Sequence, residues 1–209
     1  MFYDPQDFPF TAKLEAHWPV IRQEVEKIPK EAFVSWPTQE GMFAPGWTLF
    51  GFYAFGRRYD DMCEMCPQTS ALVAEIPGMM VSGLSSMEAN IHLPPHVGSN
   101  KAVLRCHMGV MVPEGCRVRV LDQTRPYEEG KMLIFDDTLE HEVWSAPEGR
   151  RVNLIFDIWK PWRYPGHRWT RLKQRLGMAL GVKRSDIRNI ADMEYERQKQ
   201  KLKELQTAS

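Results

Sequence analysis

The feature that most constrains the fold is a long series of short β-prone segments that begins at Met79 and ends at residue 159. Turn signals containing glycine and proline separate the segments, and many short strands spaced in this way are typical of a β-sandwich or a barrel. Helical patterns precede and follow the series instead of alternating with it, so the chain is predicted to be α+β. Strands are expected at residues 80–86, 89–94, 101–112, 116–121, 131–136, 139–145 and 150–159.

Amphipathic segments lie on both sides of these strands. The first repeats apolar residues at helical spacing, although Pro19 is expected to break or kink the helix. An aromatic, β-prone run at residues 47–56 predicts one further strand. Helices are predicted, in chain order, at residues 11–28, 69–76, 168–180 and 186–205.

The distribution of charge suggests two parts with different physical roles. Residues 161–209 hold 12 Lys and Arg against 5 Asp and Glu, whereas residues 1–160 hold 15 against 22. We expect one domain at residues 1–162, with its β core at about 79–160, and a basic helical extension at residues 163–209. A basic helix of this kind suits contact with an anionic surface or with another protein.

The overall composition is that of an ordinary soluble globular protein, with 43% hydrophobic and 26% charged residues. The net charge is zero, and we expect no nucleic-acid partner. No apolar run approaches the roughly 20 residues of a membrane span, so no transmembrane segment is expected. The first ten residues, MFYDPQDFPF, lack the basic start and apolar centre of a secretory signal. A cytoplasmic protein is therefore expected.

Polar residues recur on one face of two predicted strands. Period-2 alternation places the following residues on those faces, opposite apolar ones: Arg105, His107, Arg151, Asn153 and Asp157. Arg150 is predicted to face the opposite way from Arg151. A solvated outer face and a polar-lined cavity both explain such a pattern. Three histidines and two arginines spread over several strands favour the cavity.

Two histidines, His96 and His141, lie 45 residues apart and bracket the central strands, with His107 between them. Arg151 follows His141 by ten residues. Neutral imidazole is a common ligand for iron, zinc and copper. The layout suits a non-haem iron with an anionic co-substrate. The remaining histidines are interpreted as structural or surface residues: His17, His92 and His167.

Four cysteines are too few for a disulfide scaffold in a chain of 209 residues. Cys63 and Cys66 form a CxxC motif, which can be a redox pair or half of a zinc site. No second CxxC completes a four-thiolate site, so we interpret both as ordinary thiols.

Several segments in a fixed order carry a resemblance to a known family. They are PPHVG at 94–98, VLRCHMGVMVPEGC at 103–116, FDDTLEHEVW at 135–144, and Arg151 followed by FDIWKP at 156–161. Over roughly residues 45–160 the chain resembles the aspartyl/asparaginyl β-hydroxylase family, and GRR at 56–58 and CP at 66–67 are similar to the family's upstream segment. The resemblance implies a double-stranded β-helix, or jelly roll, that uses Fe(II), 2-oxoglutarate and O₂.

By this resemblance, His96 and His141 are the iron ligands. Many non-haem iron oxygenases add a carboxylate two residues after the first histidine, but here that position is Gly98. A glycine there matches the aspartyl hydroxylase branch, whereas the lipid A hydroxylases, which are more distantly similar, keep an aspartate. Asp137, four residues before His141, is a candidate second-shell base for a water in the vacant position.

The resemblance also implies a co-substrate site. Arg151 matches the arginine that pairs with the far carboxylate of 2-oxoglutarate, and an arginine fork suits that role because it grips a carboxylate with two parallel bonds. Ser85 matches an assisting serine, with Ser86 as a rival one residue away. Arg105 and His107 match residues that contact the co-substrate or the substrate near the metal.

The reaction implied is hydroxylation of an unactivated C–H, most directly at the β-carbon of an Asp-like or Asn-like unit. That unit can belong to a peptide, a natural-product intermediate or a free amino acid. An anionic substrate needs cations, for which Arg57, Arg58 and Arg105 are candidates. Two other interpretations stay open. One is a lipid-chain hydroxylase that works at an anionic membrane surface, and the other is a non-catalytic, metal-binding jelly roll that acts as a small-molecule sensor.

Overall fold

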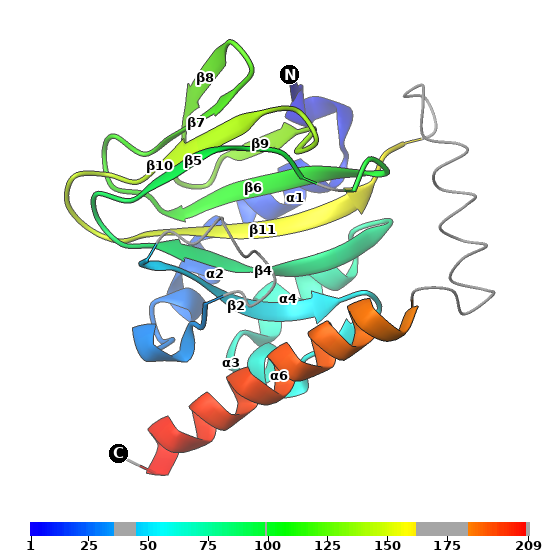
Figure 1. The fold of residues 1–209 in the computed structure, drawn as a ribbon, viewed down its shortest axis with the longest axis vertical. Helices are drawn as coiled ribbons and strands as arrows, with labels where there is room; N and C mark the ends of the chain where they lie inside the picture. The colour runs from blue at the N-terminus through cyan, green and yellow to red at the C-terminus, as the bar shows by residue number, and fades with distance from the viewer. Residues whose placement is uncertain (36–44, 99, 162–183, 208–209) are drawn as a thin grey trace.

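Two antiparallel β-sheets lie face to face, and helices cover the other side of the larger sheet (Figure 1). This computed structural model describes residues 1–35, 45–98, 100–161 and 184–207. The larger sheet contains, in spatial order, β1 Phe2–Tyr3, β9 Met132–Phe135, β6 Val103–Met111, β11 Arg151–Trp159, β4 Met79–Met87, β2 Trp47–Ala54 and β3 Arg57–Arg58. The smaller sheet contains β5 His92–His96, β10 His141–Trp144, β7 Arg117–Val120 and β8 Gln123–Pro126.

The order of the strands identifies the architecture. From β4 to β11 the chain alternates between the two sheets, interrupted only by the β7–β8 hairpin within the smaller one. Neighbours in each sheet are consequently distant in sequence, as in a double-stranded β-helix. The prediction of an α+β jelly roll is confirmed. Strand β8 was not predicted, because Pro126 and an all-exposed set of side chains give it no alternating pattern.

The helices are α1 Phe10–Ala16, α2 Trp18–Val25, α3 Asp60–Met65, α4 Pro67–Ala74 and α6 Arg184–Thr207, with two short 3₁₀ turns at Pro5–Asp7 and Lys30–Ala32. The helix predicted at 11–28 is divided, and Pro19 lies in the first turn of its second part. The helices predicted at 69–76 and 186–205 correspond to α4 and α6, whereas α3 was not predicted. The helix predicted at 168–180 lies outside the described residues.

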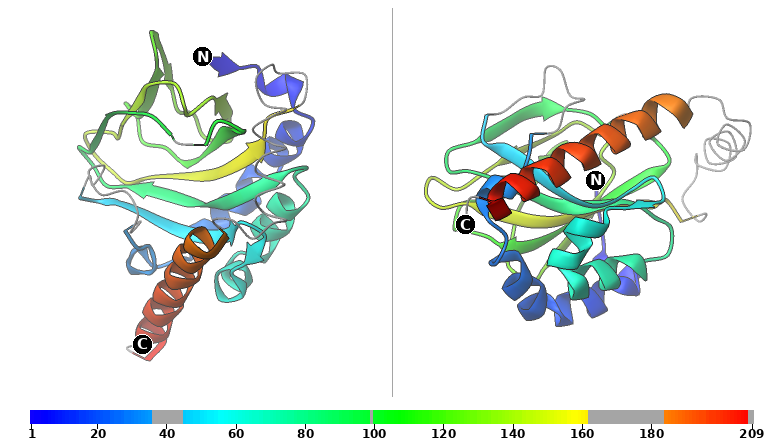
Figure 2. Two further views of the ribbon diagram at one scale, coloured as in Figure 1. Left: turned by 45° about the vertical axis from the view of Figure 1, so that its right-hand side comes forward. Right: turned by 90° about the horizontal axis from the view of Figure 1, so that it is seen from below.

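The larger sheet separates two apolar clusters. On one face Leu104, Met108 and Phe156 pack with side chains of α1, α2 and α4, which cover that face (Figure 2). On the other face a smaller cluster that includes Phe135 and Val118 lies between the sheets. The polar residues selected by alternation therefore point toward the smaller sheet. A solvated outer face is excluded for three of them, which are at most 8% exposed: His107, Arg151 and Asn153.

The helix of the C-terminal extension is docked on the sheet edge formed by β2 and β3. The side chain of Gln198 accepts a hydrogen bond from the Gly51 backbone N–H at 2.9 Å, and Tyr195 donates to Asp61 at 3.0 Å. Leu202 is buried in the same contact. None of the helices in the described ranges has the length and apolar character that a membrane crossing requires.

Candidate metal and co-substrate site

The two histidines of the predicted metal site meet between neighbouring strands. His96 ends β5, His141 begins β10, they are direct register partners, and their ring centroids lie 4.1 Å apart. The Nδ1 atom of each ring lies 2.7–2.9 Å from a backbone carbonyl oxygen two residues earlier, that of Pro94 or Leu139. A carbonyl only accepts hydrogen bonds, so Nδ1 carries the proton in both rings. Each Nε2 therefore keeps its lone pair for a metal ion.

The surroundings keep both rings in the neutral form that binds metals. Burial lowers the pKa of His141 to about 4, with the nearby His96 contributing, and burial also lowers the pKa of His96. A metal ion then has no proton to displace from either ring at neutral pH.

The acid stability of the metal-free protein tests this environment. The folded state holds the pKa of His141 at about 4, against an ordinary value of 6.5, so between these values the unfolded state binds more protons. We expect stability contributed by neutral His141 to be complete above pH 6.5 and to be lost as the pH falls toward 4. The full effect is about 3 kcal/mol, at about 1.4 kcal/mol per pKa unit. The free energy of unfolding, measured with urea from pH 7 to 4, should depend less on pH in His141→Asn than in the parent. An equal pH dependence in the two proteins contradicts the assignment.

A bulge separates His92 from the metal histidines. Four residues of uninterrupted strand would place His92 and His96 on one face, but the pairing of β5 with β10 shifts register between them. His92 consequently lies on the outer face, where its Nε2 lies 2.8 Å from Glu142 and its ring stacks on Trp144. Its side chain is 45% exposed, so the structural interpretation is confirmed.

A carboxylate takes the space that a side chain at position 98 would fill. The Gly98 backbone N–H donates to the backbone carbonyl of Asp137 at 2.6 Å, and a Cβ atom built on Gly98 would lie 2.2 Å from Oδ2 of Asp137. The other oxygen, Oδ1, is buried and has no partner among the described residues. Burial raises the pKa of Asp137. Asp137 thus offers an unpaired acceptor beside the glycine that replaces the usual carboxylate ligand.

Arg105 is held between two carboxylates. It makes two parallel 3.0 Å hydrogen bonds to Asp157, and its Nη2 lies 3.3 Å from Asp137. Burial alone would lower its pKa, but the two carboxylates raise it. The guanidinium is therefore fully compensated, and its direct effect is to position Asp137.

The turn that carries Asp137 is held in place by contacts of the neighbouring Asp136. Asp136 pairs with the ammonium of Lys160, which is 2% exposed, and also accepts a 2.7 Å hydrogen bond from the Thr138 hydroxyl. Lys160 follows β11, and its backbone N–H donates to Ala102 at 2.9 Å. The β9–β10 turn is thereby tied to the end of the strand that bears Arg151.

Arg151 is a buried cation without a counter-ion. It is 2% exposed, and no carboxylate of the described residues lies within ion-pair distance of it. Its Nη2 lies 3.4 Å from the Ser85 hydroxyl, but Nε and Nη1 have no partner among these residues. Its guanidinium carbon lies 5.0 Å from the centroid of the Tyr127 ring. Burial lowers the pKa of Arg151, yet a guanidinium stays charged in proteins. An unpaired buried charge is costly, so the geometry calls for an anion.

The register of β4 against β11 shows which of the two candidate serines lies beside Arg151. Ser85 pairs across the sheet with Asn153, and its Oγ accepts from Trp47 Nε1 at 3.0 Å as well as from Arg151. Ser86 lies on the other face, where its hydroxyl accepts from Arg150 Nε at 2.7 Å. Ser85 is therefore the serine beside Arg151, and Arg150 faces away, as alternation predicts.

His107 links the two parts of the site. Its Nδ1 lies 2.8 Å from the Tyr127 hydroxyl, and the Phe135 ring lies between it and His141, with centroid distances of 5.1 and 5.4 Å. Burial, together with Arg105, lowers the pKa of His107 well below its ordinary value. His107 is thus a neutral hydrogen-bonding group that lies between the two histidines of the metal site and Tyr127.

Arg57 and Arg58 are not brought to this site. They form β3, at the opposite edge of the larger sheet from β9. Arg57 pairs with Asp192 and stacks on Tyr195, both on α6, while Arg58 pairs with Asp60. Their charges are used to hold α6 and α3, so their placement does not support the predicted role in substrate binding.

The sequence analysis missed Trp47 and Tyr127. Trp47 begins a predicted strand in phase with Leu49, so its inward direction could have been found from alternation. Tyr127 follows the unpredicted strand β8, and no local pattern indicated that its ring would lie beneath Arg151.

The CxxC interpretation agrees with the structure, since Cys63 and Cys66 are buried free thiols and burial raises the pKa of both, that of Cys66 to about 12. No group of three potential metal ligands occurs in the described part of the chain.

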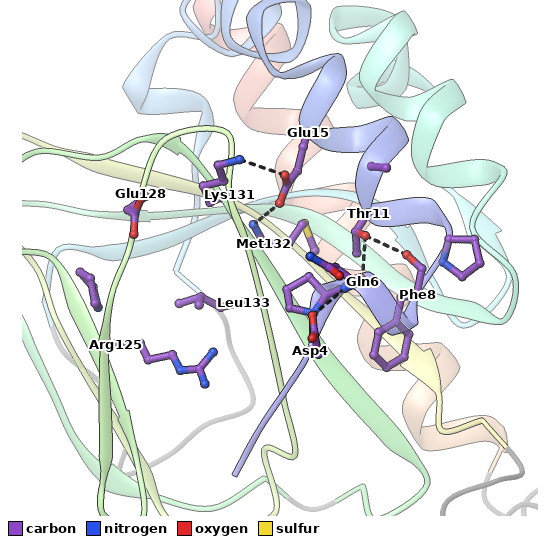
Figure 3. Close-up of a pocket in the computed structure, with 14 residues that line it drawn as sticks. Asp4, Gln6, Phe8, Thr11, Glu15, Arg125, Glu128, Lys131, Met132 and Leu133 are labelled. Carbon is purple, nitrogen blue, oxygen red and sulfur yellow. Dashed lines mark hydrogen bonds and ion pairs between the residues drawn. The ribbon is translucent and has the colours of Figure 1, made fainter.

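A separate pocket of about 600 Å³ lies between the N-terminal segment and the strands β8 and β9 (Figure 3). Several of its charged groups already have partners within the protein. Glu15 accepts from the Met132 backbone N–H at 3.0 Å and pairs with Lys131 at 3.3 Å. Asp4 accepts from the Gln6 backbone N–H. None of the predicted site residues lines this pocket, so its size does not identify it as the reaction centre.

Comparisons with known proteins agree with the geometry. The family described as "Aspartyl/Asparaginyl beta-hydroxylase" matches residues 15–161. An ornithine lipid ester-linked acyl 2-hydroxylase of Rhizobium tropici is 36% identical over 173 residues, which cover 78% of this chain and 62% of that protein. The human aspartyl/asparaginyl β-hydroxylase is 36% identical over 163 residues, 74% of this chain and 22% of that protein.

The chain thus spans less than two thirds of the length of either relative. Among solved structures, the cupin domain of Schizosaccharomyces pombe Cnp3 aligns with a TM-score of 0.41 and 10% identity over 68% of this chain and 78% of that chain. The jelly-roll assignment itself rests on the strand pairing described above. From the extent of the family match, the chain belongs to the aspartyl/asparaginyl β-hydroxylase family.

Proposed function

We propose that this protein is an Fe(II)- and 2-oxoglutarate-dependent dioxygenase that hydroxylates the β-carbon of an Asp-like or Asn-like unit. The substrate is a peptide, a natural-product intermediate or a free amino acid. The choice of carbon and residue follows the name of the human relative. The donor set of the site supports the choice of cofactors.

One observation carries the proposal. Two neutral histidines with free Nε2 atoms and a buried arginine without a counter-ion lie in the same layer between the sheets. Imidazole nitrogens suit Fe(II), and two unpaired guanidinium donors suit one end of a dicarboxylate. The residues therefore fit both groups that the family implies.

Each residue has a separate task in this scheme. His96 and His141 hold the iron, while Arg151 and Ser85 hold the distal carboxylate of 2-oxoglutarate. Asp137, whose carboxylate Arg105 keeps in place, would accept a hydrogen bond from a water near the iron, where Gly98 supplies no ligand. When bound, iron with 2-oxoglutarate and O₂ supplies the oxidising power that places one oxygen on an unactivated C–H and the other in succinate.

Hydroxylation of a lipid chain is the second candidate. The Rhizobium tropici relative is named for the acyl chain of an ornithine lipid and aligns over a larger share of its own length than the human protein does. The basic extension at residues 163–209 would then face an anionic membrane surface. In the described part of that extension Lys199 is already paired with Asp61, and Arg197 donates to the Ser35 carbonyl. The β-carbon proposal does not depend on these cations.

Mass spectrometry tests the proposal. Purified protein with Fe(II), 2-oxoglutarate and O₂ is offered Asp- and Asn-containing peptides, the free amino acids and acyl lipids. A gain of one oxygen in the first two groups supports β-hydroxylation, and a gain only in the lipids favours the second candidate. Succinate release that requires Fe(II) separates an enzyme from a non-catalytic sensor. Absence of product and of succinate with every substrate contradicts both catalytic proposals.

Gly98 provides a separate prediction. A side chain at this position collides with Asp137, because a Cβ would lie 2.2 Å from its carboxylate. We expect Gly98→Asp to retain iron binding and to lose stability and most of the turnover. Adding Asp137→Gly should remove the collision and restore stability without restoring turnover. Thermal melts and iron titration of both variants provide the measurements. If Gly98→Asp alone is as active as the parent, the absence of a carboxylate at position 98 has no special role.

A further inference from the structure

Beside Arg151 lies a second buried polar group that the protein leaves unsatisfied. Asn153 is 0% exposed, and neither its amide nitrogen nor its amide oxygen has a hydrogen-bond partner among the described residues. It shares the inward face of β11 with Arg151 two residues earlier, roughly 7 Å away along the strand. A buried amide without partners is costly, so a side chain kept in this state calls for an explanation.

The surroundings of Asn153 explain why the protein does not satisfy it. Its register partners are Ser85 on β4 and Gly109 on β6. The glycine allows the loop after β8 to rest directly on the sheet, since a Cβ on Gly109 would lie 2.2 Å from the Glu128 carbonyl oxygen. This loop carries Tyr127 under the guanidinium of Arg151. The amide is therefore closed off from bulk solvent.

The free polar atoms in this corner are nearly all donors. Arg151 contributes the N–H groups of Nε and Nη1, and Asn153 contributes the NH₂ group of Nδ2. Ser85 already accepts from Trp47 and Arg151, so its own hydroxyl hydrogen remains to be donated. A carboxylate has about four lone-pair sites and accepts from several such donors at once. One anionic group would satisfy Arg151, Ser85 and Asn153 together.

We propose that Asn153 is a further anchor for the distal carboxylate of 2-oxoglutarate, in addition to Arg151 and Ser85. This inference rests on the proposed function. The amide nitrogen donates to the carboxylate, and the amide oxygen accepts from a water that binds with it. A neutral donor strengthens the grip on the anion without adding a second buried charge to the ligand-free protein. Asn153 would thereby gain, on ligand binding, the partners that the described residues do not provide.

Two substitutions test this role through binding and stability. Asn153→Leu removes the unsatisfied amide, so we expect a higher melting temperature of the ligand-free, metal-free protein. The same variant should bind 2-oxoglutarate roughly ten- to hundredfold more weakly, as expected for one lost hydrogen bond to a charged group. Asn153→Asp supplies an internal carboxylate for Arg151, so the ligand-free protein should again melt higher and the binding of 2-oxoglutarate should be lost. Calorimetric titration of 2-oxoglutarate into the Mn(II)-loaded protein without O₂ measures the affinity.

Ser82 provides a matched control. Its hydroxyl is also buried without a partner, but it lies opposite Phe156 on the helix-covered face of the sheet. Ser82→Ala should leave the affinity for 2-oxoglutarate within about twofold of the parent. If Asn153→Leu and Asn153→Asp also bind within that range, or if both lower the melting temperature, Asn153 is a structural residue and the inference is overturned. If the parent itself does not bind 2-oxoglutarate, the proposed function fails first, while a higher melting temperature of Asn153→Asp would still report its pairing with Arg151.

Discussion

Replacing either His96 or His141 with alanine is expected to abolish Fe(II)-dependent turnover while leaving the domain folded. We propose that the two rings, whose centroids lie 4.1 Å apart, bind the metal, and the described part of the chain holds no group of three potential ligands that could compensate for a loss. The decrease should exceed the roughly 10- to 100-fold that removal of an outer-shell partner causes. Neither side chain hydrogen bonds through Nε2 to any of the described residues, so we expect the strand pairing to survive the substitution. Succinate release, iron content and circular dichroism measure turnover, binding and folding separately.

His92→Ala is the matched control, because His92 belongs to the same strand but lies on its outer face. We expect this variant to keep its iron and to change turnover several-fold at most. Full activity in His96→Ala or His141→Ala would contradict the metal assignment. Loss of iron in His92→Ala would instead place the site on the outside of the smaller sheet.

Alternation along the strands predicted much of the candidate site. Arg105 and His107 on β6, and Arg151 and Asn153 on β11, all point toward the smaller sheet. The prediction works because helices cover the other face, which therefore needs a continuous apolar surface. A strand with one apolar and one polar face has a strongly specified register. That signal is local and can be read without knowing which strands are neighbours.

The parts that could not be predicted depend on contacts between distant segments. Nothing near Gly98 indicates that Asp137 will fill its side-chain space, because the contact joins the end of β5 to the β9–β10 turn. The bulge that turns His92 outward is likewise a property of the pairing with β10 and not of the β5 sequence. Arg57 has the charge expected for substrate binding, but it is used by Asp192 on α6, far along the chain.

Arg151→Ala is expected to raise the apparent Michaelis constant for 2-oxoglutarate by two to four decades. In the parent a bound carboxylate would compensate the charge of Arg151, whose Nε and Nη1 have no hydrogen-bond partner among the described residues. Without Arg151 the carboxylate would be buried unpaired, and breaking such a pair costs roughly 3–5 kcal/mol. At about 1.4 kcal/mol per decade, this gives the expected range. Arg151→Lys should recover only part of the loss, because an ammonium cannot reproduce the two parallel bonds of the fork.

Arg150→Ala separates this effect from a general loss of positive charge. Arg150 precedes Arg151 directly, but it donates to Ser86 and stacks on Phe33 on the opposite side of the sheet. Its removal should leave the Michaelis constant for 2-oxoglutarate within about twofold of the parent, as is usual away from a binding site. The two variants differ by one position, so a register shift of one residue would exchange their outcomes. A larger effect at Arg150 than at Arg151 would therefore mean that β11 presents its other face to the co-substrate, and it would also remove Asn153 from the site.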